Sequence, residues 1–207
     1  MIKKRHGGAP GQLGEVLYKG VPPVPIVFFY QRERDTEVLH VDFAGPPSPR
    51  TVTRIHRAEY YNQGSEPNFQ ETVKAILAKY GPPTTSRPDV GLFTWFYGQG
   101  GLLRTPPANA ARCVPGPADR KVTFYANELS SPPGNPSAVF LENCGTVMDI
   151  QVGPATNPQL VQTLAVVMID HRAGLAARNL TQEHVIQAGD RLRDSEANAA
   201  KAKTPSL

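Results

Sequence analysis

Five residues have side chains that could carry acid–base or metal chemistry: His40, Asp42, His56, Asp170 and His171. His40 and Asp42 share one face of a segment of alternating polarity, and His56 lies with Glu59 on the next such segment. If the two segments pair, their imidazoles and carboxylates would meet, as a metal-dependent enzyme or a small hydrolase requires. The alternative is a solvated sheet face, expected where one side of an antiparallel sheet meets water. We favour the solvated face.

Asp170 and His171 follow an apolar run and put a carboxylate beside an imidazole, which could serve as a general base. Neighbouring residues on a strand point to opposite faces, and on a helix they diverge by about 100°. A shared reaction centre is therefore hard to build from this pair. We favour the alternative that Asp170 caps the last helix.

Two cysteines, Cys113 and Cys144, flank a segment rich in Pro and Gly. A zinc site is not expected, because there is no Cys-x-x-Cys pair and no histidine at ligand spacing. We favour one disulfide over two buried free thiols, since loop-rich exported domains use such bonds. No serine lies in a Gly-x-Ser-x-Gly elbow and no glycine-rich phosphate loop is present, so we expect no catalytic residues and no cofactor.

An aromatic segment at residues 92–97 offers two faces to a binding partner. Phe93, Trp95 and Tyr97 lie on one face, either as an exposed aromatic platform or as core beneath a helix. We favour core. Thr94 and Phe96, on the other face, are then the candidate binding residues if that face is uncovered.

Charge and hydropathy limit the partners and the location. The net charge is +4, and the basic residues are scattered, which argues against nucleic acid. No apolar run is long enough to span a membrane. Residues 1–5 resemble the start of a signal peptide, but no apolar stretch follows. We expect a periplasmic or secreted protein whose leader is missing from this chain; the alternative is a cytoplasmic protein.

The pattern of apolar residues predicts an α+β fold with a mainly antiparallel sheet. Strands are predicted at residues 24–30, 38–43, 51–61 (with a bulge), 92–97, 102–103, 122–126, 138–141, 146–152 and 160–169, the last being either a strand or the start of a helix. A short amphipathic helix at about 67–80 packs on the sheet, a polar loop at 84–90 follows it, and a second helix begins near 170. The predicted organisation is an extended arm at 1–24, one domain at 25–194 and a frayed tail at 195–207.

The short helix has clear start and stop signals. Asn68 and Glu71 resemble a capping box, and Gly81 followed by two prolines ends the helix. This helix, the Lys79–Pro83 turn, the Trp95-Phe96-Tyr97 strand and the later cysteine pair together resemble uncharacterised exported proteins of proteobacteria, over residues 37–171. The helix, turn and strand alone are also similar to the small outer-membrane-assembly lipoprotein fold (BamE-like), a scaffold that binds partners. No lipidated cysteine is present, so lipid anchoring is not expected.

These patterns favour a non-catalytic protein-binding or structural module of the bacterial envelope or extracellular space, with a protein as its partner. The first alternative is the small hydrolase or metal-dependent enzyme described above. A second is a subunit of a larger assembly whose arm and tail are ordered only by neighbours.

Overall fold

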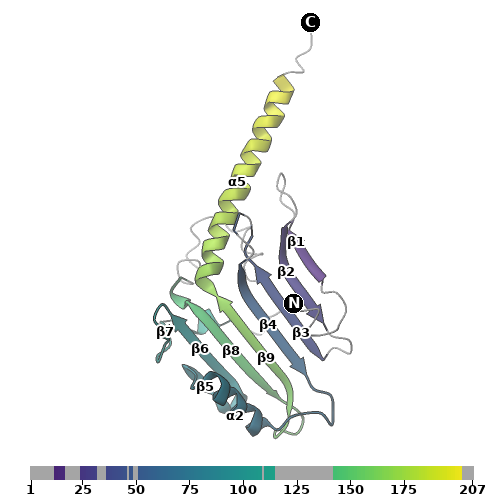
Figure 1. The fold of residues 1–207 in the computed structure, drawn as a ribbon, viewed down its shortest axis with the longest axis vertical. Helices are drawn as coiled ribbons and strands as arrows, with labels where there is room; N and C mark the ends of the chain where they lie inside the picture. The colour runs from purple at the N-terminus through teal and green to yellow at the C-terminus, as the bar shows by residue number, and fades with distance from the viewer. Residues whose placement is uncertain are drawn as a thin grey trace.

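The computed structural model describes residues 12–16, 24–31, 36–45, 47–48, 51–108, 110–114 and 142–201, with the backbone alone for residues 12–16 and 24–31. Within these residues, nine strands form one antiparallel sheet in the order β1-β2-β3-β4-β9-β8-β6-β5, with β7 also paired to β6 (Figure 1). The predicted α+β class is therefore confirmed. The predicted strands at 122–126 and 138–141 lie outside the described residues.

The first four strands form a meander, each hydrogen-bonded to the next. They are β1 (Gln12–Val16), β2 (Val24–Gln31), β3 (Glu37–Phe43) and β4 (Val52–Tyr60). The pairing of β3 with β4 shifts register between Asp42 and Phe43, which is where the predicted bulge is found. Residues 12–16 of the predicted arm thus form the edge strand of the sheet.

The remaining strands build the other half of the sheet: β5 (Thr85–Arg87), β6 (Leu92–Gly98), β7 (Gly101–Leu102), β8 (Thr146–Pro154) and β9 (Val161–Asp170). The last of the described strands, β9, lies between β4 and β8 and joins the two halves. The segment 160–169 is thereby a strand. The predicted loop at 84–90 is wrong, because its residues form β5 and the 3-10 turn η1 (Pro88–Val90).

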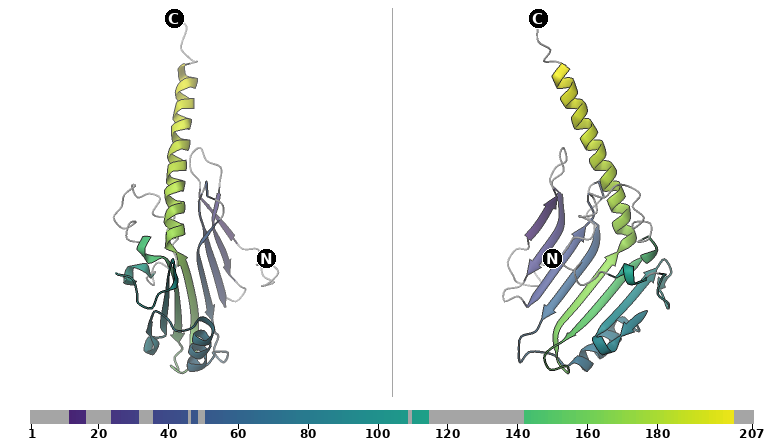
Figure 2. Two further views of the ribbon diagram at one scale, coloured as in Figure 1. Left: turned by 60° about the vertical axis from the view of Figure 1, so that its left-hand side comes forward. Right: turned by 180° about the vertical axis from the view of Figure 1, so that it is seen from behind.

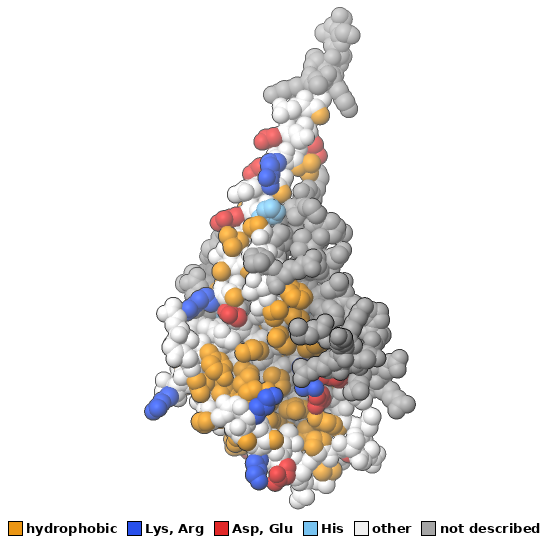
Figure 3. All heavy atoms as spheres, viewed as in Figure 1, with side chains coloured by type: hydrophobic (Ala, Val, Ile, Leu, Met, Phe, Trp, Pro, Cys, Tyr) orange, Lys and Arg blue, Asp and Glu red, His pale blue; other side chains and the backbone are white. Residues whose placement is uncertain are grey.

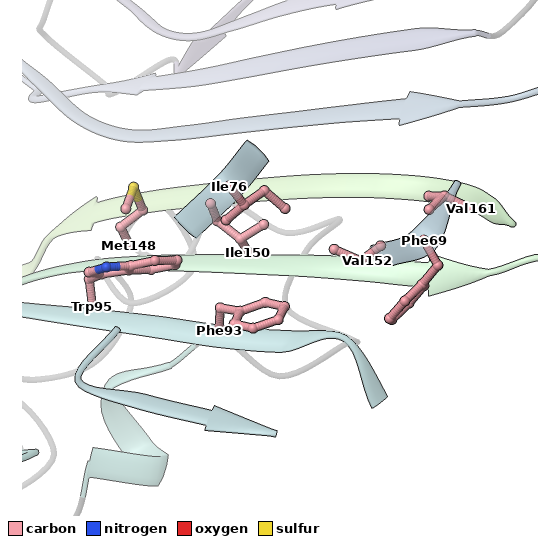
Figure 4. Packing of buried hydrophobic residues seen from close by; sticks show 8 residues of the cluster. All are labelled: Phe69, Ile76, Phe93, Trp95, Met148, Ile150, Val152 and Val161. Carbon is pink, nitrogen blue, oxygen red and sulfur yellow. The ribbon is translucent and has the colours of Figure 1, made fainter. Parts of the chain in front are cut away.

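Helix α2 (Phe69–Tyr80) covers β6 and β8 on one face of the sheet (Figure 1). The Asn68 side chain accepts a hydrogen bond from the Glu71 backbone N–H at 3.1 Å, and Gly81, with φ of 75°, ends the helix. Its apolar face packs on a buried cluster that includes Phe93, Trp95 and Ile150 (Figure 4). The predicted core role of Phe93 and Trp95 is confirmed.

Helix α5 (His171–Lys201) follows β9 directly and has 31 residues, so it is about 46 Å long. Leu175, in its first turns, packs with Phe96 and Val147 on the sheet face opposite to α2. Beyond these turns the helix projects past the end of the sheet (Figure 2). Residues 195–201, predicted as part of a frayed tail, are helical. None of the described helices combines the length and hydropathy needed to cross a membrane.

Candidate functional site

Four polar residues gather on one face of β3 and β4. The strand register puts His40 opposite His56 and Asp42 opposite Arg54. Asp42 Oδ1 lies 3.4 Å from His40 Nε2, and Asp42 Oδ2 lies 3.7 Å from Arg54 Nη1. We call these four residues the polar cluster. Three of the five sequence-predicted residues, His40, Asp42 and His56, are therefore on one face of adjacent strands.

The polar cluster is buried, so the prediction of a solvated sheet face is wrong. Asp42 is 5 % exposed and His56 is 8 % exposed. Helix α5 contacts β4, β8 and β9 on this face, where periodicity alone predicts water, and the short η4 turn (Glu142–Cys144) packs on the same face nearer to β6 and β8. Among the described residues, neither Asp42 carboxylate oxygen has a hydrogen bond.

Burial changes the protonation of the polar cluster. It raises the pKa of Asp42 from 3.8 to about 6, although the nearby Arg54 guanidinium opposes this shift. Burial also lowers the pKa of His40 from 6.5, and Arg54 adds to that effect. A carboxyl group that titrates near pH 6 beside an imidazole can exchange protons, which is the minimum for acid–base chemistry.

Asp170 and His171 have structural partners at the junction of β9 and α5. Asp170 Oδ1 accepts a hydrogen bond from the Ala173 backbone N–H at 2.8 Å, so its predicted role as a helix cap is confirmed. His171 is buried, and its Nε2 lies 2.8 Å from the Cys113 carbonyl oxygen. Burial lowers the pKa of His171. Among the described residues, no group of three or more His, Cys, Asp or Glu side chains could hold a metal ion.

The predicted disulfide between Cys113 and Cys144 is confirmed. It joins α3 (Ala110–Cys113) to η4, with the two Cα atoms 5.5 Å apart. Both cysteines are buried against Phe96, Val147 and Leu175. Phe96 is 1 % exposed beneath them, so it offers no surface to a partner.

Thr94, the other residue of the candidate binding face, lines a pocket at the β5 edge of the sheet. The pocket has a volume of about 300 Å³ and is lined by Thr85, Ser86, Arg87, Leu92, Thr94, Val114, Asp149 and Gln151. We call it the edge pocket. Sequence reasoning singled out only Thr94. Asp149 and Gln151 alternate with apolar residues along one strand, a pattern that puts both side chains on the same face and could have identified them as pocket residues.

A second surface feature lies on the α2 side of the sheet. Register pairs Val41 with Ile55 and Ile55 with Met168, and Leu39 and Val166 lie on the same face one step along. These five residues form what we call the apolar strip, in which Val41 is buried, at 8 % exposure, and Leu39 and Val166 are partly buried. Ile55 is 38 % exposed and Met168 is 42 % exposed. Hydrophobic side chains gather over the sheet in the space-filling view (Figure 3).

The chain was compared with protein-family models, curated proteins and solved structures, and none of the three comparisons found a match.

Proposed function

We propose that this protein is a non-catalytic module of the bacterial envelope or extracellular space that binds another protein through the apolar strip. The observation that carries the proposal is the exposure of Ile55 and Met168 side by side on two central strands. Central strands of a sheet normally have their apolar face covered, as α2 covers β6 and β8. Two neighbouring exposed apolar side chains beside such a helix favour a partner that completes the layer.

The surroundings of the strip suit a partner with an apolar surface bordered by charges. Arg57 lies on the same face, between Leu39 and Val166 in register. It donates a hydrogen bond from Nε to Glu37 Oε1 at 2.8 Å and also pairs with Glu59. Pairing of these charges within the protein leaves the neighbouring apolar side chains as the main source of binding free energy.

The residues that could carry acid–base or metal chemistry have surroundings that support a non-catalytic role. Asp170 is used as a helix cap, and His171 is bonded to the Cys113 carbonyl. The polar cluster is buried on the sheet face that α5 contacts, where substrate access would require rearrangement. The Cys113–Cys144 disulfide favours an oxidising compartment.

Photo-crosslinking tests the proposal. A benzophenone amino acid replaces Met168 in the producing cells, and the control carries the same group at Lys74, which is exposed on α2. We expect a discrete adduct with one protein from position 168 only. Ile55→Asp, introduced into the crosslinking chain, should abolish the adduct, whereas Glu71→Gln should not. Equal adducts from both positions, or an adduct that survives Ile55→Asp, would contradict binding through the strip.

A small hydrolase or metal-dependent enzyme remains the second candidate, favoured by the 3.4 Å contact between His40 and Asp42. Turnover of ester, phosphoester and peptide substrates, with and without added Zn²⁺ or Mg²⁺, tests this alternative. Activity that is lost in Asp42→Asn but kept in Arg57→Gln would support the enzyme. Equal turnover by both variants and the parent protein would assign it to a contaminant.

A further inference from the structure

We propose that the edge pocket binds a small, uncharged, polyhydroxylated molecule of the sugar or polyol class. This site is distinct from the apolar strip, because the pocket opens on the other face of the sheet. Thr94 is paired in register with Asp149, and both belong to the face that carries Phe96 and Val147, opposite to α2.

The floor of the pocket is formed by Thr94, Asp149 and Gln151, whose side chains are hydrogen-bonded to one another. Thr94 Oγ1 donates to Asp149 Oδ1 at 2.8 Å, and Gln151 Nε2 donates to Asp149 Oδ2 at 3.2 Å. Thr94 and Asp149 are both more than nine-tenths buried. Because the hydroxyl proton of Thr94 is directed at Asp149, the lone pairs of its oxygen are left for a donor from the ligand. Gln151 keeps a carbonyl oxygen and a second N–H.

The mouth of the pocket is the edge strand β5, whose three residues are all exposed. Thr85 and Arg87 pair in register with Thr94 and Leu92, so their side chains lie on the pocket side of the sheet. Thr85 contributes a hydroxyl group, and Arg87 contributes a guanidinium with donors in a fixed plane. Leu92 and Val114 provide apolar walls, which suit the C–H surface of a ring. Val114 follows Cys113 directly, so the disulfide holds this wall in place. A volume of about 300 Å³ lies at the small end of ligand sites.

The balance of charges selects an uncharged ligand. An anion would approach the Asp149 carboxylate, and a cation would approach the Arg87 guanidinium, so either would meet a like charge in a small space. The remaining polar groups are hydroxyls and an amide, which both donate and accept. Hydroxyl groups of a sugar or polyol match that mixture, since each can also donate and accept.

The test is ligand-observed NMR, with isothermal titration calorimetry of any hit, on the full-length protein. The probes are glucose, mannose, N-acetylglucosamine and myo-inositol, with glucuronate, glucosamine and glycine as charged comparators. We expect saturable binding of at least one uncharged probe. Arg87→Gln and Thr94→Val should each weaken it about tenfold, the loss of one hydrogen bond to a charged or buried group. Thr85→Trp, which fills the mouth, should abolish it.

Lys74→Ala on α2 is the matched control and should leave the affinity unchanged. Circular dichroism establishes that each variant is folded, and Arg87→Gln, at an exposed position, remains informative if Thr94→Val unfolds. The proposal is overturned if no uncharged probe binds, if a charged comparator binds more tightly, or if binding persists in folded Thr85→Trp.

Discussion

His40 Nε2 lies 3.4 Å from Asp42 Oδ1 on a buried face of β3, and Arg54 Nη1 lies 3.7 Å from the other oxygen of the same carboxylate. The pKa of Asp42 is raised and the pKa of His40 is lowered, so the two groups affect stability in opposite directions as the pH changes. Burial makes the folded protein favour protonated Asp42 and neutral His40. The free energy of unfolding should therefore depend on pH through both groups, with opposite signs.

Asp42→Asn should remove the loss of folding stability that ionisation of the buried Asp42 carboxyl group causes as the pH rises. The pKa of Asp42 is about 6 in the folded protein and 3.8 in the reference state, so the folded state holds the proton more tightly between these values. Stability from this group is present below pH 3.8 and is lost as the pH rises through 6. The free energy of unfolding of Asp42→Asn, relative to the parent, should rise by about 2 kcal/mol from pH 4 to pH 7. Urea titrations in matched buffers measure this difference; a flat difference would contradict it.

His40→Gln should show the opposite trend. The pKa of His40 is lowered from 6.5 by burial, so protonation below pH 6.5 favours the unfolded chain. The stability of the parent should fall as the pH drops through this window, and the glutamine variant should lose less. The same urea titrations give the comparison. The prediction would be contradicted if the free energy of unfolding of His40→Gln, relative to the parent, increased with rising pH.

Removal of the disulfide should destabilise the fold strongly. The bond closes a loop with a sequence separation of 31, and on the chain-entropy model it contributes about 3–4 kcal/mol. Cys113→Ala combined with Cys144→Ala should lower the free energy of unfolding by that amount. Dithiothreitol should destabilise the parent protein and have no effect on the double variant. The prediction would be contradicted if the free energy of unfolding of the parent protein did not change after both cysteines had been fully reduced.

Local signals in the sequence predicted the elements well. The Asn68 cap, the Gly81 stop and the Asp170 cap depend on hydrogen bonds within four residues, so composition and spacing encode them. The face of Phe93 and Trp95 follows from strand alternation alone.

Strand order and the contacts between distant segments could not be predicted from local sequence signals. The insertion of β9 between β4 and β8 is a choice among strand pairings that periodicity does not distinguish. That insertion brings α5 onto the face of the polar cluster, where Asp42 is buried although periodicity alone predicts water. The edge pocket likewise needs Asp149 beside Thr94, a register known only once β6 pairs with β8.

Ile76→Ala should measure how much the packing of α2 contributes. Ile76 is buried among Trp95, Ile150 and Val161, so truncation leaves a cavity in the main core. We expect a loss of about 2–5 kcal/mol in the free energy of unfolding. Lys74→Ala, two residues earlier on an exposed position of the helix, should cost less than about 0.5 kcal/mol. Similar losses for the two variants in urea would show that α2 does not pack on the sheet through Ile76.

Gly45→Ala tests how closely α5 approaches the end of β3. A Cβ atom at Gly45 would lie 2.7 Å from Thr181 Oγ1 and 2.9 Å from Thr181 Cγ2, which is closer than van der Waals contact allows. Thr181 is buried, and its hydroxyl donates to the Ala177 carbonyl at 2.8 Å, so it has little freedom to move away. We expect Gly45→Ala to cost about 1–3 kcal/mol. Gly100→Ala, where the added atom meets nothing within 4 Å, is the control and should be far milder.

Thr181→Ala removes the two nearest atoms that a Cβ at Gly45 would meet and leaves only the Thr181 Cβ, at 3.4 Å. In a double-mutant cycle, the combined variant should therefore lose less free energy of unfolding than the sum of the two single variants. The coupling should approach the cost of Gly45→Ala itself, because the steric conflict is its main cause. Strict additivity would mean that α5 does not lie against Gly45. Loss of the coupling at urea concentrations where the sheet is still folded would show that α5 detaches from the sheet before global unfolding.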